Sequence, residues 1–166
     1  MKGEKSMLTP FIRLFAILSW VSIFFMPSNA IKRYMPVTIL SALITVTVTF
    51  VGVNYNFWYV KGGIKTRTWN LLTIVLVLFP LGNLWIFYLT YRNFWLYLLA
   101  NIINNLVYAY KFIPFLEKIK FLKYKKFNQF IHIIVAMFYS LLLYGYQKMY
   151  EKQEHKLFML NAKKEG

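Results

Sequence analysis

The chain has 166 residues, of which 59% are hydrophobic and 20% aromatic, and its net charge of +15 comes from 20 Lys and Arg against five acidic residues. Soluble domains carry about 25% charged residues, this chain carries 15%, and so short a chain has too little interior to bury this much apolar surface from water. The composition therefore argues against an ordinary soluble domain and predicts an integral membrane protein.

Five apolar segments have the length that a membrane-spanning helix requires, about 17 to 25 residues. They cover residues 8–26, 35–53, 69–89, 94–110 and 128–146. Tyrosine and tryptophan gather near their ends, where amphipathic rings reach the lipid headgroups. The predicted fold class is all-α: a polytopic transmembrane helix bundle over residues 1–146 and a polar basic tail over 147–166. If one segment is re-entrant, the spans number four instead of five.

The first segment has two interpretations. Lys2, Lys5 and Arg13 precede an apolar core, and small residues follow it up to Ala30. This is the order of a secretory signal peptide cleaved after Ala30. The positive charges directly after that position favour an uncleaved signal anchor instead. Both interpretations put the N-terminus in the cytoplasm.

The distribution of Lys and Arg gives a weaker topology signal. With five spans, the N-terminus and the loops 55–68 and 111–127 share one side and carry twelve basic residues, against eight on the other side. Because the side with more Lys and Arg is usually cytoplasmic, the count favours a cytoplasmic N-terminus in a bacterial plasma membrane. The basic tail argues the other way, which keeps a four-span arrangement open.

Prolines and short loops define the remaining elements. Pro36 is expected in the first turn of the second helix, where a missing N–H costs little, whereas Pro80 should kink the third helix. Only "TYRN" separates the third and fourth segments, which predicts a tight antiparallel hairpin. Residues 112–122 are expected to form a short amphipathic helix on the membrane surface.

Four asparagines form the strongest polar signal within the spans. Asn101 and Asn105 lie one helical turn apart with Asn104 beside them, and Asn83 falls on the facing helix of the predicted hairpin. An unpaired amide in hydrocarbon costs several kcal/mol, so this candidate face must turn toward protein. Structural hydrogen bonding between helices is the first interpretation, and a ligand or ion path is the second.

Basic residues near the predicted membrane surface are candidates for contacts with anionic lipid headgroups. They are Lys61, Lys65, Arg67, Lys118, Lys123, Lys125 and Lys126. Gly62 and Gly63 beside the first three match no phosphate-binding signature and serve equally as a turn.

The sequence offers little for catalysis. There is no Asp or Cys, and no motif of a serine hydrolase, zinc protease or phosphate loop occurs. His132 is the sole titratable group within the fifth segment, and a residue near the interface is favoured over a proton relay. We therefore predict no catalytic residue, no metal and no cofactor, and we favour a protein that is not an enzyme.

Four stretches carry a resemblance to known proteins: "KRYMPVTILSAL", "WYVKGGIKTRTWN", "GNLWIFYLTYRNFWLYLL" and "YSLLLYGYQK". The chain resembles small multi-pass membrane proteins of spore-forming Firmicutes, over about residues 8–152, and that group has no activity to transfer. The expected function is a non-enzymatic membrane component that packs with itself or with a membrane partner protein and contacts lipid but not nucleic acid. The alternative is a small transporter or channel-like subunit with the asparagines near its path.

Overall fold

The structure is a computed structural model that describes residues 14, 18–55, 57–60, 64–118, 122–125 and 128–165. The described chain is predominantly helical, as predicted, with five α-helices and two short strands. The elements are η1 (Ser22–Phe25, a 3₁₀ helix), α2 (Ser28–Asn54), β1 (Trp58–Val60), α3 (Ile64–Thr90), α4 (Phe94–Val107), η2 (Tyr108–Phe112, a π-helix), α5 (Ile113–Lys118), β2 (Leu122–Tyr124) and α6 (Gln129–Glu165).

Two of the described helices are long and apolar enough to cross a membrane. They are Ser28–Asn54 and Gln129–Asn161, and only 28% and 17% of their most apolar windows are buried. The core helix of a soluble protein would be mostly buried, so these outward apolar surfaces are compatible with a lipid environment. Of the predicted span 8–26, residues 14 and 18–26 are described, and residues 8–13 and 15–17 lie outside the described residues.

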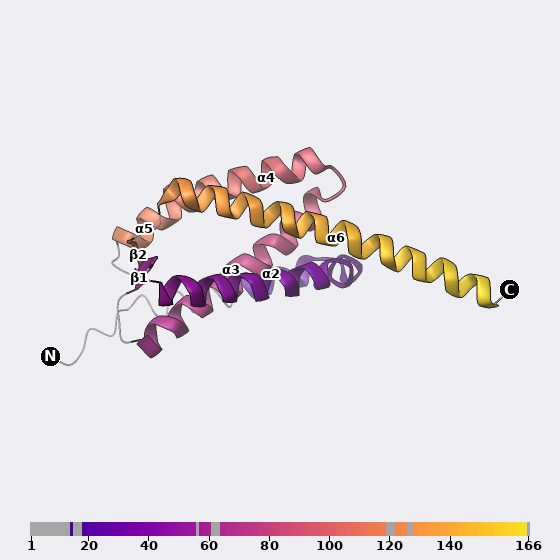
Figure 1. The fold of residues 1–166 in the computed structure, drawn as a ribbon, viewed down its shortest axis with the longest axis horizontal. Helices are drawn as coiled ribbons and strands as arrows, with labels where there is room; N and C mark the ends of the chain where they lie inside the picture. Colours follow the sequence, from indigo (N-terminus) through magenta and orange to yellow (C-terminus); the bar gives the residue numbers. More distant parts are fainter. Residues whose placement is uncertain are drawn as a thin grey trace.

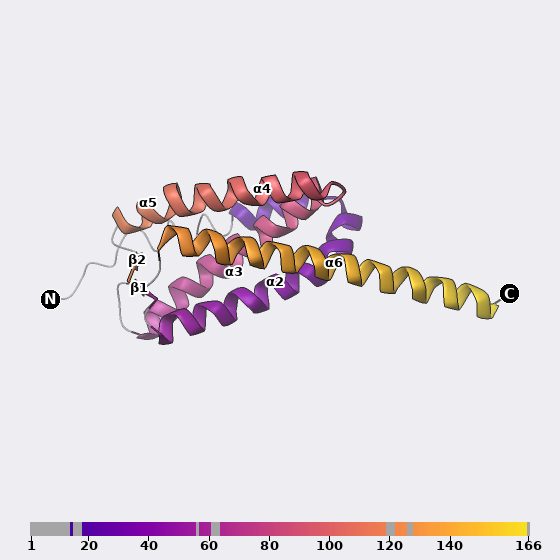
Figure 2. The same ribbon diagram turned by 45° about the horizontal axis from the view of Figure 1, so that its top comes forward.

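The four long helices lie side by side, and the contacts between them define the bundle (Figures 1 and 2). α2 packs chiefly against α3, and α6 packs against α4 and α2. At one end of the bundle an aromatic core joins α3, α4 and α6: Phe87 and Tyr97 are fully buried, and the Tyr97 ring lies 5.0 Å from Phe87 and 4.9 Å from Tyr144, centroid to centroid.

The α3–α4 hairpin has the tight turn that the sequence predicts. α3 ends at Thr90 and α4 begins at Phe94. Asn93 caps α4, because its Oδ1 accepts hydrogen bonds from the backbone N–H groups of Trp95 (3.0 Å) and Leu96 (3.3 Å). The cap fixes where α4 starts and so which of its faces turns inward.

A π-helical turn keeps one face of the α4–η2–α5 segment buried over a long distance. The buried residues Tyr97, Asn101, Asn105, Ala109 and Ile113 follow one another at intervals of four. In a 3.6-residue helix such a row drifts around the axis by about 40° per step. The wider turn of η2, in which the Ile113 N–H donates to Tyr108 O, offsets that drift at its last step.

A two-stranded antiparallel ribbon joins the two loop segments at one end of the bundle (Figure 1). β1 and β2 pair with Tyr59 opposite Lys123, and Lys125 N donates to Phe57 O at 3.0 Å. The charge count assigned the loops 55–68 and 111–127 to the same side, and the ribbon agrees with that assignment.

Two expectations about element boundaries were wrong. The helix expected over 112–122 is instead α5, six residues long, and its Ile113 and Leu116 are buried within the protein, while residues 122–124 form β2. Pro36 lies inside α2 and not in its first turn, because the helix already starts at Ser28. The polar tail after residue 146 extends the last helix, since α6 continues to Glu165.

Candidate functional site

A cavity of about 480 Å³ lies between α3, α4, η2 and α6, with Ser19 and Ser22 at one wall. Its size falls in the range of about 300–1,000 Å³ that is typical of small-molecule sites. All four asparagines that the sequence singled out line it, together with apolar and aromatic side chains. The described lining consists of Ser19, Ser22, Phe79, Leu81, Gly82, Asn83, Trp85, Asn101, Asn104, Asn105, Val107, Tyr108, Phe112, Ala136, Tyr139 and Ser140.

Asn83 joins three helices on one side of the cavity. Its Nδ2 donates to Ser41 Oγ of α2 (3.0 Å), to Tyr139 OH of α6 (3.0 Å) and to the backbone carbonyl of Phe79 (2.9 Å). A carbonyl cannot donate, so the contact with Phe79 fixes which amide atom is the nitrogen. No described residue donates to Asn83 Oδ1. Asn83 therefore offers the cavity a hydrogen-bond acceptor.

Asn101 is paired within the protein. Its Oδ1 accepts from Ser140 Oγ at 2.9 Å, its Nδ2 donates to Tyr97 O at 2.9 Å, and its side chain is only 2% exposed. Tyr97 OH in turn donates to Ser140 O at 2.8 Å. This set of bonds holds α4 against α6, which is the structural role predicted first. The asparagine face was expected to turn toward α3, but its direct partners lie on α6.

Asn104 and Asn105 differ from Asn101 because they have few partners. Asn105 is buried, yet its Nδ2 reaches only the weak acceptor Met137 Sδ at 3.6 Å. Asn104 is exposed, and its side chain makes no hydrogen bond with a described residue. Both carboxamides keep donor and acceptor capacity for a molecule inside the cavity.

The described lining contains no charged side chain. A buried ion needs an opposite charge or many ligand oxygens, since desolvating it costs several kcal/mol. In addition, no group of three or more His, Asp or Glu among the described residues could hold a metal ion. The chemistry of this cavity therefore suits a neutral molecule that donates hydrogen bonds, and the described lining contains no acid–base pair.

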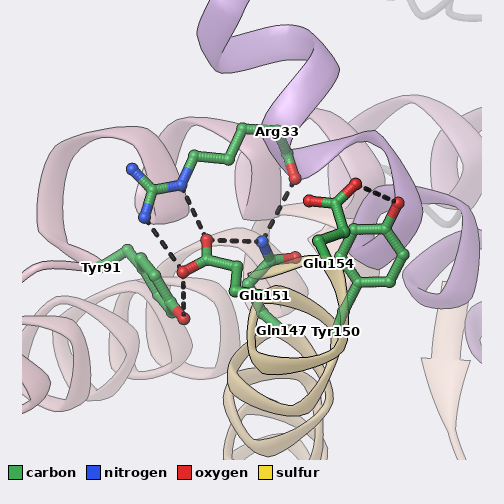
Figure 3. Close-up of polar contacts among 6 residues, drawn as sticks. All are labelled: Arg33, Tyr91, Gln147, Tyr150, Glu151 and Glu154. Atoms are coloured by element: carbon green, nitrogen blue, oxygen red, sulfur yellow. Dashed lines mark hydrogen bonds and ion pairs between the residues drawn. The ribbon is translucent and has the colours of Figure 1, made fainter. Parts of the chain in front are cut away.

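A second polar cluster, at the end of the bundle where α3 turns into α4, is charged (Figure 3). Arg33 of α2 binds Glu151 of α6 with both carboxylate oxygens engaged: Nε to Oε1 at 2.7 Å and Nη2 to Oε2 at 3.0 Å. Tyr91 OH donates to Oε2 at 3.2 Å, and Gln147 Nε2 donates to Oε1 at 3.0 Å and to Arg33 O at 3.2 Å.

Two aromatic rings flank the guanidinium of Arg33. Its Cζ lies 5.4 Å from the centroid of Tyr34 and 5.5 Å from that of Tyr91, within the distance of a cation–π contact. Burial raises the pKa of the Tyr91 phenol, and the neighbouring Glu151 carboxylate raises it further, so the phenol stays a neutral donor. The cluster ties α2, the α3–α4 turn and α6 together.

Sequence reasoning did not find this cluster. Arg33 was counted only as a topology charge, and Glu151 lies 118 residues away. One signal was present, because the five-span arrangement puts Arg33 and the segment after residue 146 on the same side. An arginine and a glutamate at matching ends of two helices could have suggested the pair.

The candidate lipid-contact residues that the structure describes lie toward the end of the bundle that carries the ribbon of β1 and β2. Lys118 and Lys125 are exposed. Lys65 and Arg67 lie in the first turns of α3, and Lys123 lies in β2. Lys61 and Lys126 lie outside the described residues.

His132 lies in the first turn of α6 and stacks on Tyr108, with the ring centroids 5.0 Å apart and the ring planes 18° from parallel. It does not line the cavity. A position in the first turn of α6 is compatible with the expected histidine near the interface, and the choice between that role and a proton relay stays a prediction.

Comparison with family models, curated proteins and solved structures finds no match to this chain. The resemblance to small multi-pass proteins of spore-forming Firmicutes therefore stays a prediction.

Proposed function

We propose that this chain is an integral, multi-pass protein of a bacterial plasma membrane whose interhelical cavity binds a small uncharged ligand, as in a small transporter-type subunit. The observation that carries the proposal is the contrast among the four asparagines. Both the Nδ2 and the Oδ1 of Asn101 are hydrogen-bonded, to Tyr97 and to Ser140. In contrast, Asn83, Asn104 and Asn105 keep hydrogen-bonding capacity beside a cavity of about 480 Å³. Buried amides that only hold helices together are usually paired, although Gln147 Oε1 of the Arg33 cluster is an exception.

The membrane environment is supported by the outer surface of the bundle. Large apolar side chains such as Phe24 (89% exposed), Phe138 (69%) and Leu43 (61%) face outward from three different elements. Such large exposed apolar side chains are compatible with a lipid environment. Four or five spans, with the ribbon end in the cytoplasm next to anionic headgroups, fit the basic residues of both loops.

The second candidate is a structural membrane component that packs with itself or with a partner protein. It is favoured by the network of Ser41, Asn83 and Tyr139, because interhelical bonds of this kind are what holds membrane helices together. Under this proposal the cavity is a packing gap and the remaining amide groups bind nothing specific.

The natural absence of cysteine makes labelling a direct test of both topology and ligand binding. Single-cysteine variants at Lys125 and at Arg92 are treated with a membrane-impermeant maleimide in intact cells and in lysed cells. We expect Arg92→Cys to be labelled in intact cells and Lys125→Cys only after lysis. Labelling of both positions in intact cells would contradict the proposed topology.

Ligand binding is tested on the chain reconstituted in lipid nanodiscs, with a panel of neutral polyols, amides and uncharged lipids. We expect at least one of them to raise the midpoint of thermal unfolding, and we expect Asn104→Leu with Asn105→Leu to abolish that rise. If no panel member binds the folded chain, the cavity is a packing gap and the second candidate stands.

A further inference from the structure

The position of the cavity mouth bears on what kind of molecule enters it, provided that the proposed function holds. Asn104 lies ten residues into α4, about 15 Å from the end of the bundle at a rise of 1.5 Å per residue. The hydrocarbon core of a bilayer is about 30 Å thick. The asparagines therefore lie inside the hydrocarbon core, about 15 Å from the start of α4 and about 10 Å from the exposed Lys111 that follows in η2.

At the opening of the cavity the exposed amide of Asn104 lies beside exposed apolar side chains. Val107 lines the cavity and is 54% exposed, and its neighbours Leu99 (52%) and Ile103 (53%) are exposed on the same helix. In a bilayer this surface meets acyl chains. A molecule that passes Val107 therefore comes from the lipid phase, and a solute from the water would have to cross hydrocarbon first.

The polar groups beyond the mouth suit an uncharged group that both donates and accepts hydrogen bonds. Asn83 Oδ1 is an acceptor with no described donor, and Asn104 and Asn105 add two further carboxamides. The described lining has no cation that could pair with a phosphate and no carboxylate that could pair with an amine. A hydroxyl group satisfies these acceptors and carries no desolvation cost of an ion.

The volume limits how much of the ligand is enclosed. A cavity of about 480 Å³ equals roughly 16 liquid water molecules, which suits a glycerol-sized headgroup and its adjoining ester groups. The acyl chains would leave past Val107 into the bilayer. From mouth, polarity and volume together we infer that the ligand is an uncharged, hydroxyl-bearing membrane lipid of the diacylglycerol type, bound through Asn83, Asn104 and Asn105.

Cysteine protection at the mouth tests this inference on the full chain in nanodiscs. Val107→Cys lies at the mouth, and Leu99→Cys is the matched control on the same helix outside the cavity. Labelling by N-ethylmaleimide is followed by intact mass. We expect 1,2-dioctanoylglycerol to slow labelling of Val107→Cys but not of Leu99→Cys. Adding Asn105→Leu should raise the half-protecting concentration about tenfold, and Asn104→Leu serves as a second variant if that chain does not fold.

Three related probes separate the outcomes. Dioctanoyl phosphatidic acid and the O-methyl ether of dioctanoylglycerol should protect poorly, because the first is charged and the second lacks the donor. Equal protection by either one overturns the inference. Protection by glycerol in the absence of a lipid effect also overturns it but leaves the proposed function standing. If no polyol, amide or lipid protects Val107→Cys, the proposed function itself fails.

Discussion

The two polar regions of the bundle differ in how many of their polar atoms have a hydrogen-bond partner. In the Arg33 cluster, Glu151 receives four hydrogen bonds from three residues, and aromatic rings flank the guanidinium. In the cavity, neutral amides line a space and several of their polar atoms have no described partner. The difference indicates that the Glu151 carboxylate serves the fold, since both of its oxygens are paired, although Gln147 Oε1 in the same cluster is buried without a partner among the described residues. The neutral cavity has more hydrogen-bonding capacity left for another molecule.

Replacing Tyr97, which lies between the two regions, should have the largest effect on stability. Tyr97 packs on Phe87 and Tyr144 toward the cluster, and its OH donates to Ser140 O beside the cavity. Replacing Tyr97 by Ala creates a cavity in the aromatic core and should lower the free energy of unfolding by about 3–5 kcal/mol. Thermal unfolding in detergent measures it. Tyr97→Phe, which loses only the hydroxyl, should cost about 1 kcal/mol, and equal effects would show that packing is not the main contribution.

Replacing asparagines one at a time separates the paired amide from the open one. Asn101→Leu removes the bonds to Ser140 and Tyr97 and should destabilise the bundle by about 1–2 kcal/mol. Asn104→Leu removes no described side-chain bond and should change stability by less than about 0.5 kcal/mol. Unfolding midpoints of the two variants in the same detergent compare them. Equal losses would mean that Asn104 also holds helices together, and the contrast within the cavity would disappear.

The ion pair of the cluster should contribute less than the asparagine pair, because it is partly exposed. The side chains of Arg33 and Glu151 are 46% and 28% exposed. A double-mutant cycle of Arg33→Met and Glu151→Gln should give a coupling of about 1 kcal/mol that shrinks in high salt. A coupling indistinguishable from zero would reduce the cluster to a surface contact with no part in holding α6.

The smallest effect is expected beyond the cluster. Residues 157–165 continue α6 past the bundle, and Leu157, Met159 and Leu160 are exposed there (Figure 2). Ending the chain after Lys156 should therefore change the unfolding midpoint of the bundle by less than about 2 °C. A larger drop would indicate that the end of α6 packs against the bundle or against another copy. Size-exclusion chromatography of both lengths distinguishes these two causes.

Much of the helical arrangement was predictable from composition and spacing. The hairpin at residues 90–93 and the shared face of Asn101 and Asn105 follow from segment length and helical periodicity. The partner of that face was not predictable, because Asn101 pairs with Ser140 on α6 and not with the neighbouring α3. Pairing between distant helices depends on how the bundle closes, and local periodicity says nothing about that.

The cavity combines a predictable part with an unpredictable one. The cost of an unpaired amide predicts that the four asparagines turn toward protein, and all four line one space, although Asn104 is exposed. Which of them keeps an open acceptor depends on whether a partner lies within about 3 Å, and no sequence pattern carries that information. The shortening of the expected helix 112–122 has a similar origin, since pairing of Leu122–Tyr124 with β1 competes with helix formation.

The shape of the cavity at η2 depends on how many residues the π-helical turn contains. Tyr108 and Phe112, the first and last residues of η2, both line the cavity, and their ring centroids lie 5.2 Å apart. A π-turn holds one residue more than the α-turn that would replace it. Deleting one residue between them would let an α-turn replace η2 with the helix on either side kept in register, whereas an α-turn formed without that deletion would rotate everything after it by about 100° and turn Ile113 away from the core. The aromatic end wall of the cavity therefore depends on the number of residues in this turn as much as on their identity.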